Sequence, residues 1–177
     1  GVGAILPWLD QRERLRTQMA RFLGASSDDI GFPPGTTRGI VDISQAISLK
    51  SGDVILCFEG EFPSNVIPWM TVAERVGARV ERLSLDGFGN GTGNGLQQVE
   101  DALSKGSVRL IAVSAVQFQT GLRMPLKALV ECAHRVDAEV FVDGIQALGS
   151  MPLNVAGLGV DYLVAGTHKW LMGLDGL

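Results

Sequence analysis

The sequence predicts an α/β protein with a mostly parallel sheet that helices cover on both faces. Short continuous apolar runs, such as residues 54–58 and 140–142, are typical of fully buried strands. They alternate with amphipathic segments whose apolar residues recur every three or four positions, a pattern that indicates a parallel sheet between two layers of helices. The 177 residues are 46% hydrophobic and 19% charged, which is enough apolar material for one domain with a sizeable core.

The predicted helices are amphipathic segments with helix-ending or helix-starting residues beside them. They cover residues 5–24, 36–49, 64–76, 96–103 and 125–136. Thr36 or Thr37 can cap the second of these, and Ser64 can cap the third. Gly24 and Gly77 stand where the first and third should end. The third segment should turn one apolar stripe inward, formed by Val66, Ile67, Met70 and Ala73.

The predicted strands cover residues 54–58, 79–85, 108–113, 140–142 and 162–164. Residues 79–85 alternate apolar and polar side chains, which is typical of a strand near a sheet edge. Residues 87–95 contain five glycines, but no Lys-Ser/Thr pair follows them, and they do not form the G-x-G-x-x-G pattern between a strand and a helix. We therefore expect a flexible surface loop there.

Polar clusters follow several predicted strands at the point where each strand ends. They are Glu61-Phe62, residues 117–120, Asp143 to Gln146, and residues 167–169. In an open parallel sheet, ligands bind beyond the carboxyl ends of the strands. The clusters therefore predict a single site at one edge of the sheet.

The residues in these clusters suit one kind of chemistry when they are taken together. A lysine at a strand end, Lys169, can form a Schiff base with an aldehyde cofactor, and a buried aspartate, Asp143, can keep a pyridine nitrogen protonated. Thr36 and Thr37 stand at a helix start, where a phosphate group binds readily. Pyridoxal 5'-phosphate requires this combination.

Each residue alone has a plainer interpretation, because lysines are mostly on the surface and an aspartate after a strand often caps the next turn. Lys169 would then be a surface lysine and Asp143 a turn cap. His168 would be a hydrogen-bonded structural histidine, and Phe62 a core residue.

Two segments, VDGIQALGSMPLNV and LGVDYLVAGTHKWL, resemble the cofactor signature of the class V pyridoxal-phosphate enzymes. This is the aminotransferase-like group of fold type I that includes cysteine desulfurases, kynureninases and isopenicillin-N epimerases. PGTT resembles the family's phosphate-binding turn, and EFPSNVIPW resembles the segment with its ring-stacking residue. The resemblance extends from Phe32 to Leu177.

The resemblance implies a role for each matching residue. Lys169 would form the Schiff base and then move protons at the substrate α-carbon. Asp143 would pair with the pyridinium nitrogen, and Gln146 would hydrogen-bond the phenolic oxygen of the ring. Phe62 would lie over the ring face. Phosphate contacts would come from Thr36, Thr37 and His168, with Thr167 as a weaker addition.

The sequence also departs from the family pattern. Gly166 stands where desulfurases often have a serine that contacts the phosphate, and Phe118 aligns with a frequent asparagine near the ring oxygen. Phe62 and Phe118 disfavour a standard desulfurase. The persulfide cysteine and the arginine for the substrate carboxylate would lie beyond Leu177. We therefore expect residues 1–177 to form a single but incomplete cofactor-binding large domain, without the closing strand and the small carboxyl-terminal domain.

Composition excludes several other classes of function. The net charge is −4 and the chain has no long basic run, which disfavours binding to nucleic acid or to an anionic membrane. Cys57 lies in a strand-like apolar run and Cys132 in a helix-like one. We therefore expect both to be inert core thiols rather than part of a disulfide framework. From the sequence we expect neither a secretory leader nor a membrane-spanning run. We expect a cytoplasmic homodimer that uses no metal.

Three functional hypotheses follow. The first is a pyridoxal-phosphate enzyme acting on an amino acid, in which transamination, C–S lysis, epimerisation and kynureninase-like cleavage share the same residues. The second is a catalytically inactive folded module that serves structure or partner binding. The third, a nucleotide-binding α/β domain, lacks the glycine fingerprint that it would need.

Overall fold

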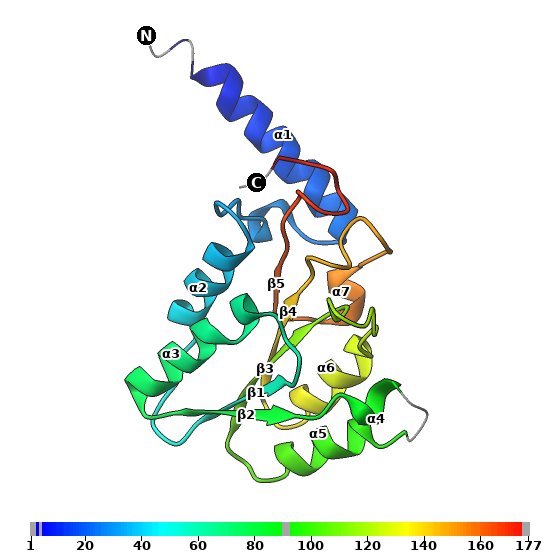
Figure 1. Ribbon diagram of the computed structural model, residues 1–177. Helices are drawn as coiled ribbons and strands as arrows, with labels where there is room; N and C mark the ends of the chain where they lie inside the picture. Colours follow the sequence, from blue (N-terminus) through cyan, green and yellow to red (C-terminus); the bar gives the residue numbers. More distant parts are fainter. Residues whose placement is uncertain (1–2, 4, 90–92, 175–177) are drawn as a thin grey trace.

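The computed structural model describes residues 3, 5–89 and 93–174, and its helices and strands alternate along the chain (Figure 1). The helices are α1 (Leu6–Leu23), α2 (Thr36–Ala46), α3 (Ile67–Val76), α4 (Asp86–Gly89), α5 (Gly95–Leu103), α6 (Leu126–His134) and α7 (Val155–Leu158). Two short 3₁₀ helices are η2 (Ser27–Asp29) and η3 (Pro63–Asn65). The strands are β1 (Val54–Phe58), β2 (Arg79–Leu83), β3 (Val108–Ser114), β4 (Glu139–Asp143) and β5 (Tyr162–Val164).

The five strands form one parallel sheet in the order β2-β1-β3-β4-β5, which confirms the predicted fold class. The chain moves from β1 to one side for β2 and then crosses to the other side for β3. The strand order therefore reverses between β1 and β3, and such a switch point leaves a crevice at the carboxyl ends. The register pairs Ser114 with Asp143, so the last residues of β3 and β4 lie side by side at this edge.

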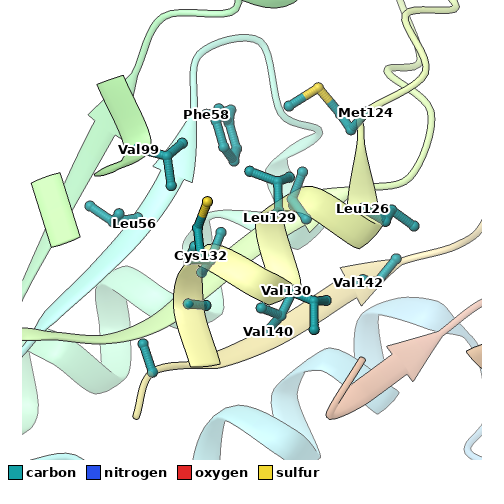
Figure 2. Packing of buried hydrophobic residues seen from close by; sticks show 14 of the residues in the cluster. Leu56, Phe58, Val99, Met124, Leu126, Leu129, Val130, Cys132, Val140 and Val142 are labelled. Atoms are coloured by element: carbon teal, nitrogen blue, oxygen red, sulfur yellow. The ribbon is translucent and has the colours of Figure 1, made fainter. Parts of the chain in front are cut away.

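Both faces of the sheet are buried under helices, because the strands turn alternate side chains to opposite faces. From β1, Leu56 and Phe58 belong to the core under α5 and α6, whereas Ile55 and Cys57 belong to the core under α2 and α3. Figure 2 shows part of the first core, where Leu129 and Cys132 of α6 lie close to strand residues. The layered arrangement fixes the strand ends that carry the polar clusters.

Helix α1 matches its predicted range but projects from the body of the molecule (Figure 1). Its buried residues are Ala20 and Leu23, near the carboxyl end, while Leu9, Leu15 and Phe22 are exposed. The apolar spacing therefore predicted the helix correctly, although most of its apolar side chains do not pack against the sheet. No described helix combines the length and hydropathy needed to span a membrane.

The predicted helix caps at residues 36, 37 and 64 are wrong. Gly35 is the N-cap of α2, and its φ of 101° brings the chain into the helix without a side-chain cap. Thr36 and Thr37 are instead the first residues of α2 itself. Ser64 lies in η3, and its hydroxyl is 2.9 Å from the Thr37 hydroxyl. Helix α2 ends at Ala46 because the next residue, Ile47, has extended backbone angles.

The predicted inward stripe of the third helix is also partly wrong. Ile67 and Met70 are exposed, whereas Trp69 and Val72 are buried. The reason is that α3 begins at Ile67, after the η3 turn, so this turn and not a serine cap sets the helical phase. The Trp69 ring then packs edge-on against Phe141 of β4, with 5.0 Å between ring centroids.

The glycine-rich segment is not entirely a loop. Residues 86–89 form the short helix α4, and residues 90–92 lie outside the described part of the chain. The two cysteines are both buried, as predicted. Burial raises the pKa of the Cys57 thiol to about 12, so this thiol is un-ionised at neutral pH and a poor nucleophile.

Candidate functional site

A cavity of about 280 Å³ lies at the carboxyl edge of the sheet, where the polar clusters converge. The predicted site residues that line it are Thr36, Thr37, Phe62, Asp143, Gln146, His168 and Lys169. Larger hollows of about 550 and 610 Å³ lie elsewhere, but neither contains Asp143 or Lys169. Thr167 is not in the lining, and its hydroxyl donates to the Leu174 carbonyl at 3.1 Å. The structure thus brings together every predicted site residue except Thr167.

Asp143 is the last residue of β4 and is almost completely buried. Its Oδ1 accepts a hydrogen bond from the Ile145 amide at 3.0 Å, so it also caps the following turn. Burial raises the pKa of this carboxyl to about 6; the Ile145 amide opposes the rise, Glu61 adds to it, and Lys169 opposes it again. A buried carboxylate beside a cavity favours a ligand that brings a cationic N–H group to it.

The amino end of α2 faces the cavity with an unused hydroxyl. Thr36 is buried, and its Oγ1 has no hydrogen-bond partner among the described residues. The first N–H groups of a helix lack partners within the helix, and the Gly35 cap provides none from a side chain. Free donors at a helix amino end and an unpartnered buried hydroxyl make a suitable site for a phosphate.

Gly166 makes room for this arrangement. A Cβ at position 166 would lie 2.8 Å from Thr36 Oγ1, closer than real Cβ atoms approach their neighbours, and 3.0 Å from His168 Nδ1, which is also a tight contact. Thr36 therefore occupies the space that a side chain at position 166 would need. The sequence has no serine at position 166, and the structure places the Thr36 hydroxyl next to this position.

Lys169 and His168 lie in the turn that follows β5, and both are exposed at the mouth of the cavity. The turn is tied to the segment after β4, because the Trp170 indole N–H donates to Gln146 Oε1 at 3.1 Å. An exposed amine on a tethered turn is accessible to an aldehyde. The two features that the sequence placed after separate strands, Asp143 and Lys169, thus face one cavity.

The opposite side of the cavity has two aromatic rings. Phe62 follows β1, Phe118 follows β3, and their rings meet edge to face with centroids 5.3 Å apart and planes at 89°. Both are about half exposed, which excludes the interpretation of Phe62 as a core residue. A flat ligand in the cavity would have an aromatic neighbour on this side.

Sequence reasoning missed the role of Glu61, which is buried next to the cavity with both carboxylate oxygens hydrogen-bonded. It also missed Ser64 and Ser114, which line the cavity. In the sequence, Glu61 stands out as a charged residue between a buried strand and a helix. No local pattern, however, shows that such a residue is buried.

A comparison with known protein families agrees with the class V resemblance that the sequence showed. Residues 8–177 match the profile of the family described as Aminotransferase class-V. Because the match covers nearly the whole chain, the chain belongs to this family, and the predicted family is confirmed.

Individual relatives have more specific names. The chain is 36% identical over 169 residues to a cysteine desulfurase of Klebsiella pneumoniae subsp. pneumoniae, with 93% of this chain and 40% of the relative covered. The apo structure of a cysteine desulfurase from Thermococcus onnurineus NA1 is 28% identical, with a TM-score of 0.83 and coverage of 93% and 40%. Another relative, described as a probable cysteine desulfurase of Mycolicibacterium paratuberculosis, is 35% identical over 90% of this chain and 23% of its own length.

The fold is also similar to that of C-DES, described as a cystine C–S lyase in complex with its reaction product cysteine persulfide. The TM-score is 0.92 at 24% identity, with 99% of this chain and 47% of C-DES covered. A second C-DES structure, of a lysine-to-alanine variant, has glycine covalently linked to its pyridoxal-phosphate cofactor. The chain spans less than half the length of the curated relatives named above.

Proposed function

We propose that this chain is the cofactor-binding part of a pyridoxal-phosphate-dependent enzyme that acts on a C–S bond of an amino acid. The observation that carries the proposal is the convergence on one cavity of Asp143, Lys169 and the amino end of α2 with Thr36. Relatives that are described as cysteine desulfurases support the choice of a C–S bond.

The residues present fit pyridoxal phosphate at both of its charged ends. The unpartnered Thr36 hydroxyl and the free N–H groups of α2 suit the phosphate, with Thr37 and His168 beside them. Asp143, which burial makes hard to ionise, suits a protonated ring nitrogen, because that cation would compensate its lost hydration. When bound, the cofactor supplies an electron sink that stabilises negative charge at the substrate α-carbon.

The chain's own groups would then have separate tasks. The Lys169 amine would hold the cofactor through its aldehyde carbon and, once displaced by the substrate amine, accept and return the α-proton. Asp143 would keep the ring nitrogen protonated. Gln146, whose Oε1 already accepts from Trp170, would use its N–H group toward the ring's phenolic oxygen. Phe62 would cover one ring face and exclude water from it.

Borohydride reduction and peptide mapping test the cofactor assignment. The purified protein is saturated with pyridoxal phosphate, reduced and digested, and we expect a pyridoxyl group on Lys169. Lys127, whose amine donates to the Gly157 carbonyl at 3.1 Å, is an internal control that should stay unmodified. An adduct spread equally over both lysines, or no adduct at all, would overturn the proposal and favour an inactive structural module.

The reaction can be assigned by product analysis with cysteine and cystine. Desulfurase cleavage of the cysteine C–S bond gives alanine and transfers the sulfur to an acceptor thiol, which must be added, as a persulfide, whereas lysis of cystine with water gives pyruvate, ammonia and cysteine persulfide. Formation of a keto acid only when a second keto acid is added would instead indicate transamination. The expected homodimer and cytoplasmic location stay predictions, and light scattering of the purified protein would check the former.

A further inference from the structure

Glu61 lies just behind the cavity wall and accepts hydrogen bonds on both carboxylate oxygens. Oε1 accepts from the Ser114 backbone N–H at 2.7 Å and from Gln117 Nε2 at 2.8 Å. Oε2 accepts from Asn65 Nδ2 at 3.0 Å and from the Ser114 hydroxyl. Glu61 is 8% exposed and is not in the cavity lining, so its carboxylate faces the protein rather than the ligand.

The carboxylate continues the sheet where β1 has ended. Strand β1 stops at Phe58, while β3 runs on to Ser114, and the next amide, of Ala115, already donates to the Asp143 carbonyl on the β4 side. Backbone N–H groups of a strand point alternately to its two neighbours, so the Ser114 N–H points to the β1 side, where no strand remains. Glu61 supplies the missing acceptor and so bridges the switch point between β1 and β3.

This bridge fixes the two aromatic residues that follow its ends. Phe62 is the neighbour of Glu61 in sequence, and Phe118 is the neighbour of Gln117. The bond from Gln117 Nε2 to Glu61 therefore holds the segments that bring the two rings into edge-to-face contact. Gln117 is buried and its Oε1 has no partner in the described part of the chain, so its side chain depends on Glu61 for anchorage.

An amide cannot replace the carboxylate in this network. An ionised carboxylate is an acceptor on both oxygens, and here both face donors. A glutamine at position 61 would direct its NH₂ either at the Ser114 backbone N–H or at Asn65 Nδ2. Turning Asn65 over would not help, because its Oδ1 already accepts from the Trp69 indole at 3.1 Å, and the turned amide would face that N–H with a second donor.

We propose that Glu61 is a positioning residue, which holds Phe62 and Phe118 in place as the wall of the cavity by bridging the ends of β1 and β3. The inference rests on the proposed function, because that wall is expected to cover the ring of pyridoxal phosphate. Glu61 acts through the residues that it holds and touches neither cofactor nor substrate.

The test compares Glu61→Gln with a matched control at the far end of the same network, Trp69→Phe. The control removes the indole donor to Asn65 but leaves every bond to Glu61 in place. Each purified protein is saturated with pyridoxal phosphate and reduced with borohydride. The fluorescence anisotropy of the pyridoxyl group on Lys169 then reports how firmly the ring is held, independently of turnover and of affinity.

We expect the anisotropy of Glu61→Gln to fall to the value of Phe62→Ala, and the dissociation constant of the unreduced cofactor to rise about tenfold. Trp69→Phe should lose thermal stability but keep the parent anisotropy. Equal anisotropy in Glu61→Gln and the parent, or an equal loss in Glu61→Gln and Trp69→Phe, would show a merely structural role and overturn the inference alone.

A parent protein with no adduct on Lys169 would overturn the proposed function together with this inference. If Glu61→Gln does not fold, Gln117→Ala replaces it, because this variant leaves the other bonds to Glu61 intact and releases only the Phe118 side. A drop in anisotropy for Gln117→Ala supports the inference, and an unchanged value contradicts it.

Discussion

The two sides of the cavity are built differently. On the side of β1 and β3, Glu61, Ser114 and Gln117 form a buried network that positions Phe62 and Phe118. On the side of β4 and β5, Asp143 and Lys169 face the cavity themselves. Asp143 is buried and accepts a hydrogen bond from the Ile145 amide, and Lys169 is exposed in the turn after β5. Thr36, which contacts this second side near Gly166, has no hydrogen-bond partner in the described residues.

The β1 and β3 side positions the cavity wall, whereas the β4 and β5 side carries the groups that we propose to bind the cofactor. A carboxylate whose two oxygens both accept hydrogen bonds, as in Glu61, holds its neighbours in one geometry, whereas a desolvated acid and an unpartnered hydroxyl cost free energy until a ligand meets them. Groups that have no partner among the described residues, such as the Thr36 hydroxyl, are therefore available for binding. Substitutions on the β4 and β5 side should change ligand chemistry or the stability of the cofactor-free protein, and four predictions test these effects.

The largest effect should come from Asp143→Asn. The amide keeps the size of the side chain but cannot hold a proton on the ring nitrogen, so the exchange of the substrate α-proton should fall by about 10²–10³-fold. The measurement is deuterium incorporation at the α-carbon, followed by NMR on the protein loaded with cofactor. Exchange at the parent rate would show that Asp143 does not act on the ring.

The same residue should make the stability of the cofactor-free protein depend on pH. Because burial raises the pKa of Asp143 from 3.8 to about 6, the folded protein binds this proton more tightly than the unfolded chain does. Its contribution is fully present below pH 3.8 and is lost as the pH rises through about 6, by at most about 3 kcal/mol.

Urea unfolding of the parent and of Asp143→Asn across pH 4–7 checks this prediction. The asparagine does not titrate, so the difference in unfolding free energy between the two proteins should change steadily in favour of the variant as the pH rises. A constant difference over that range would show that Asp143 titrates alike in the folded and unfolded chains.

Gly166→Ala should disturb the phosphate end of the cavity. The added Cβ would lie 2.8 Å from Thr36 Oγ1, so Thr36 or His168 must move, at a cost of about 1–3 kcal/mol. Gly31→Ala is the matched control, since nothing lies within 4 Å of its added Cβ. Thermal unfolding without cofactor should show a lower midpoint for Gly166→Ala than for Gly31→Ala. Equal midpoints would mean that Thr36 and His168 move aside without a cost in stability.

Thr36→Val should give the smallest effect, with opposite signs for folding and binding. The substitution removes a buried hydroxyl that has no partner in the described residues, so stability without cofactor should be unchanged or slightly higher. The affinity for pyridoxal phosphate should fall about tenfold, because one hydrogen bond to the phosphate is lost. Equilibrium titration measures the affinity, and thermal unfolding measures the stability without cofactor. A loss of both affinity and stability would show that Thr36 has a structural role.

Local patterns in the sequence were sufficient for the strands and for most helices. Residues 54–58 and 162–164 were predicted as strands with the bounds that the structure has, because a short apolar run between turns has few other conformations. The placement of Asp143 and Lys169 at one edge followed from the rule that parallel strands end together. The family resemblance implied Thr167 as a weaker phosphate contact, but its hydroxyl donates to the Leu174 carbonyl.

The caps and the phase of α3 were not predictable in the same way. Ser64 has the residue type of an N-cap, yet its hydroxyl meets Thr37, 27 positions earlier in the chain. The choice between a cap and this contact depends on how α2 and η3 pack together, and no local window contains that information.

By itself, then, the sequence determined the alternation of strands and helices, the edge of the sheet where the predicted site residues meet, and the residues that we propose as the reactive groups. Only the tertiary structure decided which polar groups have partners and which do not. It paired Glu61 with Ser114 across 53 positions, and it left Thr36 without a hydrogen-bond partner within the described chain. The physical reason is that periodicity and residue type act over a few neighbours, whereas hydrogen-bond satisfaction and desolvation depend on segments that become neighbours only after folding.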